Sequence, residues 1–331
     1  MKRLVTFLSA LGLFLLCAWP AAAEETYNLK LQCMHPPSLM GYMETYAKDV
    51  ETATQGRVKI QVFAVGELVS TTDTLKAVGS GTVDMGHACG NYYTELTIGN
   101  IEGGLPMSWA SPQEAQMIFD NLGLQKIIEK EYEKHGAHYL TSMWAVPFQI
   151  LTKEPVHSLA DLQKIKFRAV NPAAKVFKSL GVNTVSLPAE DLYLALSTGQ
   201  IDGVIYGAAY EYTVNKFVEV APYLVETPIT NPFVDHVIIN KELWDSMPAD
   251  IQAILKLASE KLRWFYYLMC VANYDKVKET AFKGVTSLPA EDVKALTKAS
   301  QAIWEEEAAR SPENAEAIKI ITEVAKAGGR L

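Results

Sequence analysis

The sequence lacks the features that mark several large classes of protein. Beyond residue 23 it has no apolar run long enough to cross a bilayer; the nearest, residues 262–271, is too short and contains Arg263. It has no internal repeat and no low-complexity tract. Lysine and arginine form no cluster, and the formal net charge is −8. These absences argue against membrane helices after residue 23 and against nucleic acid or an anionic membrane surface as a partner.

Motifs that carry catalytic chemistry are also missing. The sequence contains no G-x-S-x-G, H-E-x-x-H or C-x-x-C pattern and no glycine-rich phosphate loop. Its six histidines show no spacing that predicts a zinc site. We therefore expect no enzymatic activity, no bound metal and no cofactor.

The first 23 residues have the pattern of a secretory signal peptide. Lys2 and Arg3 precede an apolar stretch that is short for a membrane span, and three alanines, residues 21–23, precede Glu24. Cys17 follows two leucines rather than a small residue, which argues against lipidation. We expect cleavage after residue 23 and a mature protein that is free in the periplasm.

Three cysteines, Cys33, Cys89 and Cys270, lie outside this segment. An odd number leaves at least one thiol unpaired or paired between chains. Cys33 and Cys89 each end a predicted strand, so a disulfide between them is one interpretation. The other is that both are small buried apolar side chains.

Strands and helices alternate after residue 23, which is typical of an α/β fold with mainly parallel sheets. About 300 residues suffice for two lobes. The patterns predict strands over residues 26–34, 59–65, 83–88, 139–143, 148–153, 223–226 and 233–240. They predict helices over residues 40–54, 72–80, 112–122, 126–135, 211–217, 248–282, 289–309 and 312–327.

Residues 158–203 carry the most specific signal. They read as a helical turn followed by strand, helix, strand, helix and strand, and Arg168 stands at the end of the first strand. Asn171 and Pro172 open the next helix. The planar fork of arginine matches a carboxylate, and a helix N-terminus adds unpaired N–H groups. The pattern predicts that Arg168 binds a small organic anion; the alternative is a surface arginine in an ion pair.

Four blocks of the sequence resemble successive segments of one family. They are GELVSTTDTLKAVGSGTVDMGHACGNYY, SLADLQKIKFRAVNPAAKVFKSLG, SLPAEDLYLALSTGQIDG and INKELWDSMPADIQ, and they cover nearly the whole chain after residue 23 in the family's order. The family is the DctP family, the periplasmic solute-binding subunits of the tripartite ATP-independent periplasmic (TRAP) transporters. The block that ends in GHACGNYY is most similar to the 2-oxo-acid and lactate members.

The resemblance implies a two-lobed periplasmic binding protein fold with a ligand cleft between the lobes. It implies a first lobe of residues 24–147 plus 234–270 and a second lobe of residues 148–233 plus 271–331. The predicted helix over residues 248–282 would be the family's long helix, which runs along both lobes. Members of the family close on their ligand by a hinge motion.

The resemblance also implies roles for individual residues. Arg168 falls on the family's carboxylate-binding arginine, and Asn171 on a position that adds a hydrogen bond in sialate-binding members, although it could serve only as a helix N-cap. Tyr206 stands where other members carry Asn or Trp. Phe148 replaces a second basic residue of the sialate and dicarboxylate binders, which favours a ligand with one anionic group. Ile205 replaces the metal-ligating Glu of the 2-oxo-acid members and cannot ligate a metal.

Further candidates lie at the ends of predicted first-lobe strands and where the chain returns to that lobe. Open α/β sheets gather ligands at the carboxyl ends of their strands. For each of these residues, as for Tyr206 and Phe148, the alternative is an ordinary core side chain. We expect the ligand site to include His35, His87, Asn91, Tyr92, Tyr93 and Phe233.

Together these patterns predict the periplasmic solute receptor of a TRAP transporter. We expect it to bind a small monocarboxylate, such as a 2-oxo, hydroxy or aromatic acid, and to deliver it to the small and large membrane subunits. A compact sulfonate also suits a single arginine, and a C4-dicarboxylate is the second choice. A periplasmic enzyme or a sensor receptor on the same fold is a further alternative.

Overall fold

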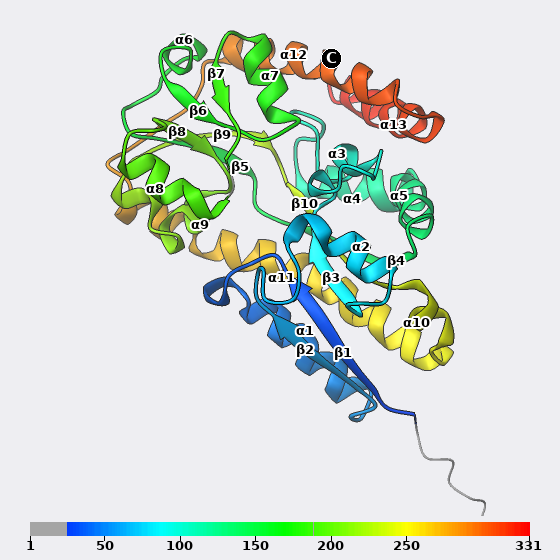
Figure 1. The fold of residues 1–331 in the computed structure, drawn as a ribbon. Coiled ribbons are helices and arrows are strands. Elements are labelled where there is room, and N and C mark those ends of the chain that lie inside the picture. The colour runs from blue at the N-terminus through cyan, green and yellow to red at the C-terminus, as the bar shows by residue number, and fades with distance from the viewer. Residues whose placement is uncertain (1–24, 188) are drawn as a thin grey trace, which may run out of the picture.

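The chain forms two β-sheets and passes between them at two short crossings (Figure 1). The computed structural model describes residues 25–187 and 189–331, so the predicted signal peptide lies outside the described residues. None of the helices in these ranges combines the length and the apolar character that a bilayer crossing requires.

The first lobe contains a five-stranded sheet with the order β2-β1-β3-β10-β4. Strands β1 (Tyr27–Cys33), β2 (Val58–Phe63) and β3 (Met85–Ala88) are parallel, whereas β10 (Val234–Asn240) runs antiparallel to β3 and to β4 (Ala137–Trp144). Because β1 and β3 are parallel neighbours, their carboxyl ends meet at one edge of the sheet, and Cys33 pairs in register with His87.

Helices cover both faces of this sheet. Helix α1 (Gly41–Ala53) and part of α11 (Ala249–Ala281) pack against one face, around Leu31, Val50 and Leu262. On the other face lie α2 (Thr74–Gly79), α3 (Gly99–Glu102), α4 (Pro112–Gln116) and α5 (Leu124–Glu133), around Val78 and Phe119. The helix predicted over residues 112–122 is divided, because Met117–Asn121 form a π-helical turn after α4.

The second lobe contains a six-stranded sheet with the order β11-β9-β5-β8-β6-β7. Its strands are β5 (Phe148–Thr152), β6 (Lys166–Arg168), β7 (Asn183–Val185), β8 (Gly203–Ile205), β9 (Tyr223–Thr230) and β11 (Gly284–Thr286). Along the chain, four helices alternate with the strands from β5 to β9: α6 (Leu159–Leu162), α7 (Ala173–Ser179), α8 (Leu192–Ser197) and α9 (Ala209–Val214). Residues 158–203 therefore follow the predicted order of elements, and the parallel strands β6 and β8 bring Arg168 and Ile205 to one sheet edge.

The two crossings between the lobes are hydrogen-bonded to each other. Residues 145–147 connect β4 to β5, and residues 231–233 connect β9 to β10. The Ala145 N–H donates to the Phe233 carbonyl at 2.9 Å, and the Phe233 N–H donates to the Val146 carbonyl at 3.2 Å. The lobes are thus joined by a paired ribbon rather than by two independent linkers.

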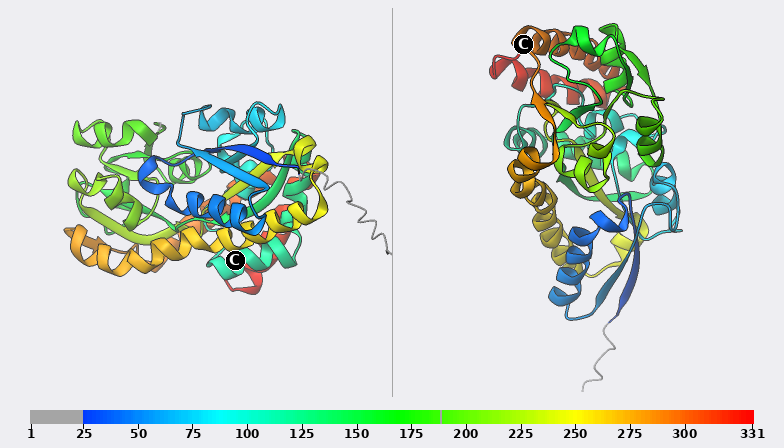
Figure 2. Two further views of the ribbon diagram at one scale, coloured as in Figure 1. Left: turned by 90° about the horizontal axis from the view of Figure 1, so that it is seen from below. Right: turned by 90° about the vertical axis from the view of Figure 1, so that its left-hand side faces the viewer.

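A third link is the 33-residue helix α11 (Ala249–Ala281), which lies along both lobes (Figure 2). The segment contains no glycine or proline, and Pro248 stands just before it, where proline suits a helix start. At 1.5 Å per residue it is about 50 Å long. Its first part packs on the first sheet, whereas Tyr274 and Lys278 bond to Gln149 and Glu226 of the second lobe. The predicted helix over residues 248–282 and the two-lobed α/β fold are confirmed.

The last two helices, α12 (Ala290–Ala308) and α13 (Pro312–Ala327), contact different lobes. Leu296 and Ile303 of α12 belong to the second lobe's core. In contrast, α13 packs against α3 and α5 of the first lobe. The predicted lobe boundaries stay a prediction, and we propose that residues 312–327 belong with the first lobe rather than the second.

The cysteines Cys33, Cys89 and Cys270 are all buried and free, so the disulfide considered between Cys33 and Cys89 is not formed. Cys33 Sγ instead lies 3.2 Å from His87 Nδ1. The register of β1 and β3 places Cys33 opposite His87, whereas Cys89 lies two residues further along the chain.

Arg263 of α11 anchors the long helix to the first lobe. This buried guanidinium donates to the Ser142 carbonyl at 3.1 Å, to Asp120 at 2.7 Å and to Gln125 at 3.0 Å. We expect Arg263→Ala to lower the free energy of unfolding by about 3 kcal/mol, because these acceptors lose their donor. Urea unfolding measures the loss.

The control for this variant is Lys294→Ala. Lys294 forms an exposed ion pair with Glu291, and such pairs contribute little, so the change should stay within about 0.5 kcal/mol. A comparable loss in the two variants would contradict the anchoring role of Arg263.

Candidate functional site

Arg168 is held as a buried cation at the carboxyl end of β6. Its side chain is 4% exposed, Nε and Nη2 donate to the Leu187 carbonyl at 3.1 and 2.9 Å, and Nη1 donates to the Ile205 carbonyl at 2.8 Å. These bonds use three of the five N–H donors of a guanidinium, leaving one on each terminal nitrogen. Among the described side chains, none forms an ion pair with Arg168. The surface-ion-pair alternative therefore does not describe this arginine.

Burial lowers the pKa of Arg168, although the nearby tyrosines 92, 212 and 206 oppose this effect. Arginine keeps its charge in proteins, so the shift reports a cation that has lost water without gaining an anion. Such a charge is costly, and an incoming anion would offset that cost.

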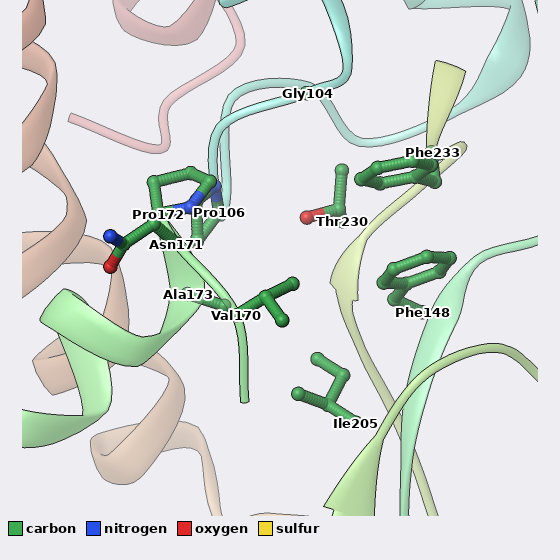
Figure 3. A pocket seen from close by; sticks show the side chains of 10 residues that line it. All are labelled: Gly104, Pro106, Phe148, Val170, Asn171, Pro172, Ala173, Ile205, Thr230 and Phe233. Carbon is green, nitrogen blue, oxygen red and sulfur yellow. The ribbon is translucent and has the colours of Figure 1, made fainter. Parts of the chain in front are cut away.

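A pocket lies between the lobes (Figure 3). Arg168, Tyr92 and Tyr206 are not among its lining residues, but Ile205 is, and its carbonyl accepts from Arg168. Its empty space is about 310 Å³, part of which is open to solvent. It is lined by the loop residues Gly104 and Pro106 of the first lobe, by the crossings and by the second lobe: Phe148, Val170, Asn171, Pro172, Ala173, Ile205, Thr230 and Phe233. The predicted residues Phe148, Phe233 and Asn171 therefore line one cavity.

Phe148 and Phe233 form one wall of the pocket. Their rings are stacked, with centroids 4.1 Å apart and planes 7° from parallel, and Figure 3 shows Ile205 beside Phe148. Phe148 begins β5 and Phe233 lies in the other crossing, so the hydrogen-bonded ribbon brings them together. The wall presents apolar surface and no charge.

A close backbone approach completes this part of the pocket. Gly104 has a φ of +100°, and a Cβ added there would lie 2.6 Å from Thr230 Cγ2. Glycine is therefore required for the first lobe's loop to lie against β9 at this point. This contact was not predicted from the sequence, because an isolated Gly-Gly pair signals only a turn.

Asn171 lies at the rim of the pocket, and its amide points away from the two rings (Figure 3). It is exposed, and Pro172 occupies the N-cap position of α7 without a side-chain cap. The N-cap alternative for Asn171 is therefore wrong.

Tyr92 and Tyr206 approach Arg168 from opposite lobes. Burial raises the pKa of Tyr92, and Cys89 and Tyr206 add to this effect while Arg168 opposes it. Tyr206 follows β8, and Tyr212 fixes its backbone by accepting from the Tyr206 N–H at 3.1 Å. Both phenols are thus electrostatic neighbours of the arginine.

The remaining predicted residues lie elsewhere in the first lobe. Tyr93 is buried in the core, with its hydroxyl 3.3 Å from His236 Nε2, and Asn91 donates to Asn100. His35 and His87 are buried at the carboxyl ends of β1 and β3, among core side chains. None of these four lines the pocket beside Arg168.

His35 and His87 form a compact group with Cys33. One potential ligand atom from each residue lies within 4.8 Å of the others, and all three side chains are buried. Within the described residues this is the group of sulfur and nitrogen donors with the geometry to hold a metal ion. The sequence search missed it because Cys33 and His87 are 54 residues apart and no spacing motif joins them.

Glu211 is a buried carboxyl group that no sequence pattern pointed to. It accepts from Tyr266 of α11 at 2.6 Å and from the Ala208 N–H at 3.1 Å. Burial raises the pKa of Glu211 from its ordinary 4.5 to about 7, although both of these bonds favour the charged form. Glu211 therefore joins the second lobe to the long helix through a group that titrates near neutral pH.

Comparisons with known proteins agree with this architecture. A family model described as "bacterial extracellular solute-binding protein, family 7" (DctP) matches residues 37–311. A monocarboxylate 2-oxoacid-binding periplasmic protein of Nostoc sp. strain PCC 7120 is 30% identical over 221 residues. The matched stretch spans 65% of this chain and 60% of that relative.

Two solved structures show the same fold. A TRAP periplasmic solute binding protein from Chromohalobacter salexigens, with bound (S)-(+)-2-amino-1-propanol, has a TM-score of 0.83 and 23% identity over 90% of this chain and 95% of that one. A TRAP periplasmic solute binding protein from Pseudoalteromonas atlantica, with bound sodium and pyruvate, has a TM-score of 0.80 and 21% identity over 91% and 94%.

The raised pKa of Glu211 predicts a dependence of stability on pH. The folded protein keeps a proton on this group between about pH 4.5 and pH 7, where the unfolded chain releases it. Its contribution to stability is therefore fully present below pH 4.5 and is lost as the pH rises through 7. The difference between the two pKa values corresponds to roughly 3 kcal/mol.

Replacing Glu211 by Gln removes this titration. We expect urea unfolding of Glu211→Gln to show a smaller fall in stability between about pH 5 and pH 8 than the parent protein shows, by up to roughly 3 kcal/mol. Glu291→Gln changes an exposed carboxylate and should keep the parent's pH dependence. An unchanged pH dependence in Glu211→Gln would refute the assignment.

Proposed function

The chain belongs to the bacterial extracellular solute-binding proteins of family 7, the solute receptors of TRAP transporters, and we propose that it binds a small monocarboxylate through Arg168 between its two lobes. The predicted family is thereby confirmed. This family consists of periplasmic receptors rather than enzymes. The identity of the ligand and the role of Arg168 belong to the proposal.

The observation that carries the proposal is the buried charge of Arg168. Two backbone carbonyls fix the guanidinium, and no described side chain forms an ion pair with it. A carboxylate can accept from a terminal N–H on each Nη atom, and such charge-assisted bonds are among the strong ones. The ligand's anionic group would then supply the missing negative charge.

The pocket wall supports a ligand with one anionic end. Phe148, Phe233 and Ile205 present apolar surface, and no described lysine or arginine lines the pocket. Arg168 lies behind this lining, bonded to the Ile205 carbonyl, and is the cation that we propose the ligand reaches. A second carboxylate there would lose water without gaining a partner. The Nostoc relative is named for monocarboxylate 2-oxoacids, and the Pseudoalteromonas structure holds pyruvate, in agreement with this class.

Polar groups near the arginine could recognise the rest of the ligand. Tyr92 is an electrostatic neighbour of Arg168 from the first lobe, and the Thr230 side chain lines the pocket. A hydroxyl group can donate to the oxygen of a 2-oxo or 2-hydroxy acid. Contacts from both lobes to one ligand would favour the closed state, which is the state that we propose docks on the membrane subunits.

Removing the guanidinium tests the proposal directly. We expect Arg168→Ala to weaken binding of pyruvate, lactate or benzoate, whichever raises the melting temperature of the parent protein, by about 2–5 kcal/mol. Arg168→Lys keeps the positive charge but loses the planar fork of donors. Its affinity for the ligand should therefore lie between those of the parent protein and Arg168→Ala. Isothermal titration calorimetry measures the affinities, and Arg310→Ala, a partly exposed arginine paired with Glu307, is the control. Parent-like binding by Arg168→Ala would rule out the proposed role.

The stacked rings of Phe148 and Phe233 predict that the size of a ligand affects its affinity. Phe148→Ala should enlarge the pocket and raise the affinity for benzoate relative to pyruvate, because a larger apolar group can fill the new space. Phe177→Ala removes a buried ring that does not line the pocket and is the matched control. Both variants should lose stability by about 3 kcal/mol. A ratio of the two affinities that is unchanged in Phe148→Ala, or changed equally in both variants, would contradict the prediction.

A further inference from the structure

The buried group of Cys33, His35 and His87 lies apart from the residues that line the pocket beside Arg168. Cys33 ends β1, His35 follows it by two residues, and His87 lies on the neighbouring parallel strand β3. Cys33 and His87 are direct partners in the ladder, so their side chains project from the same face of the sheet. Strand register therefore fixes the thiol next to an imidazole.

The distances fit a small metal ion. Ligand atoms of the three side chains lie within 4.8 Å of one another, and Cys33 Sγ is 3.2 Å from His87 Nδ1. In a tetrahedral site with metal–sulfur and metal–nitrogen bonds of about 2.3 and 2.0 Å, sulfur and nitrogen are roughly 3.5 Å apart. The backbone N–H of His35 also donates to Cys33 Sγ at 3.4 Å. This contact favours a thiolate, whereas burial raises the pKa of Cys33 to about 12, so the charged thiolate depends on the bound cation.

The surroundings of His87 resemble the outer shell of a metal site. Its Nε2 lies 3.7 Å from Asp235 Oδ2, with both side chains almost fully buried. A histidine that binds a metal through one nitrogen usually donates its other N–H to a carboxylate or carbonyl, which fixes the ring. Asp235 faces Nε2 of His87 at a distance too long for a hydrogen bond, while Nδ1 lies beside the thiol.

Asp235 is one of several first-lobe side chains with a buried polar atom that lacks a hydrogen bond, and it is the one that lies beside His87. Within the described part of the chain, its Oδ1 has no hydrogen-bond partner. A carboxylate in that position is costly unless charge nearby balances it. A divalent cation, one thiolate and the Asp235 carboxylate would together be neutral. A bound cation would favour the charged form of this carboxylate, whose pKa burial otherwise raises to about 8.

We propose that Cys33, His35 and His87 bind one zinc-like divalent transition-metal ion, with Asp235 orienting His87. One thiolate and two imidazoles suit borderline-soft ions such as Zn²⁺, whereas Ca²⁺, Mg²⁺ and Na⁺ prefer oxygen ligands. The site goes beyond the solute-binding function and differs from our expectation of no metal. Its effect is to tie the ends of β1 and β3 together.

Tyr42 completes the surroundings of the group. Its hydroxyl lies 2.8 Å from His35 Nδ1 and 3.4 Å from His87 Nε2, so it faces both imidazoles. The ring of Tyr266 lies 5.3 Å from that of His35 and is linked to Glu211 of the second lobe. The metal would therefore be enclosed by side chains from α1, α11 and both lobes.

Metal titration of the full-length protein tests the site. After treatment with a chelator, we expect the protein to bind one equivalent of Zn²⁺ in competition with a chromogenic chelator and to melt at a higher temperature. Co²⁺ in place of Zn²⁺ should give the near-ultraviolet charge-transfer band of a cobalt–thiolate bond. A parent protein that binds no stoichiometric Zn²⁺, or whose Co²⁺ form lacks this band, overturns the proposal.

Variants then locate the ligands. Cys33→Ser should abolish the charge-transfer band, and Asp235→Asn should keep it but weaken Zn²⁺ binding about 10–100-fold. Cys89→Ser removes another buried thiol and should behave as the parent does. A band that persists in Cys33→Ser or vanishes in Cys89→Ser refutes the assignment. If Cys33→Ser does not fold, the Co²⁺ spectrum of the parent still decides the question.

Discussion

The interaction on which the proposed site depends is the pair of carbonyl contacts that hold the Arg168 guanidinium, one from Leu187 just after β7 and one from Ile205 at the end of β8. The carbonyls of Leu187 and Ile205 fix its orientation without neutralising its charge. A carboxylate in their place would have formed an ion pair within the protein and closed the site to an anion. The charge therefore stays available for the ligand that we propose, because backbone dipoles rather than an acid hold the guanidinium.

The proposed site combines residues that are close to Arg168 in the sequence with residues that are distant from it. The second lobe's parallel strands position the arginine, whereas the apolar wall forms where Phe148, the first residue of β5, stacks on Phe233 of the second crossing. These two rings lie in or next to the connections between the lobes. If they contact the ligand as we propose, ligand shape and lobe closure are coupled through the same residues.

The sequence allowed the order of elements in residues 158–203, the long helix and the place of Arg168 to be predicted, because each depends on local periodicity and on short-range signals. It did not allow the stacking of Phe148 on Phe233 or the pairing of Cys33 with His87, since both arise from strand order across distant segments. Tyr93 shows the same limit, because the structure turns its hydroxyl toward His236 in the core. Side-chain direction in a loop depends on packing that no local pattern records.

The hydrogen-bonded ribbon formed by residues 145–147 and 231–233 has a mechanical consequence. Two lobes on one flexible linker would swing freely in every direction and would lose much orientational entropy on closing. A paired ribbon together with a continuous helix resists twisting and sliding but still allows bending, so the remaining freedom is close to a single angle. Opening and closing would then change mainly one angle between the lobes, and each ligand contact would favour a smaller value of that angle.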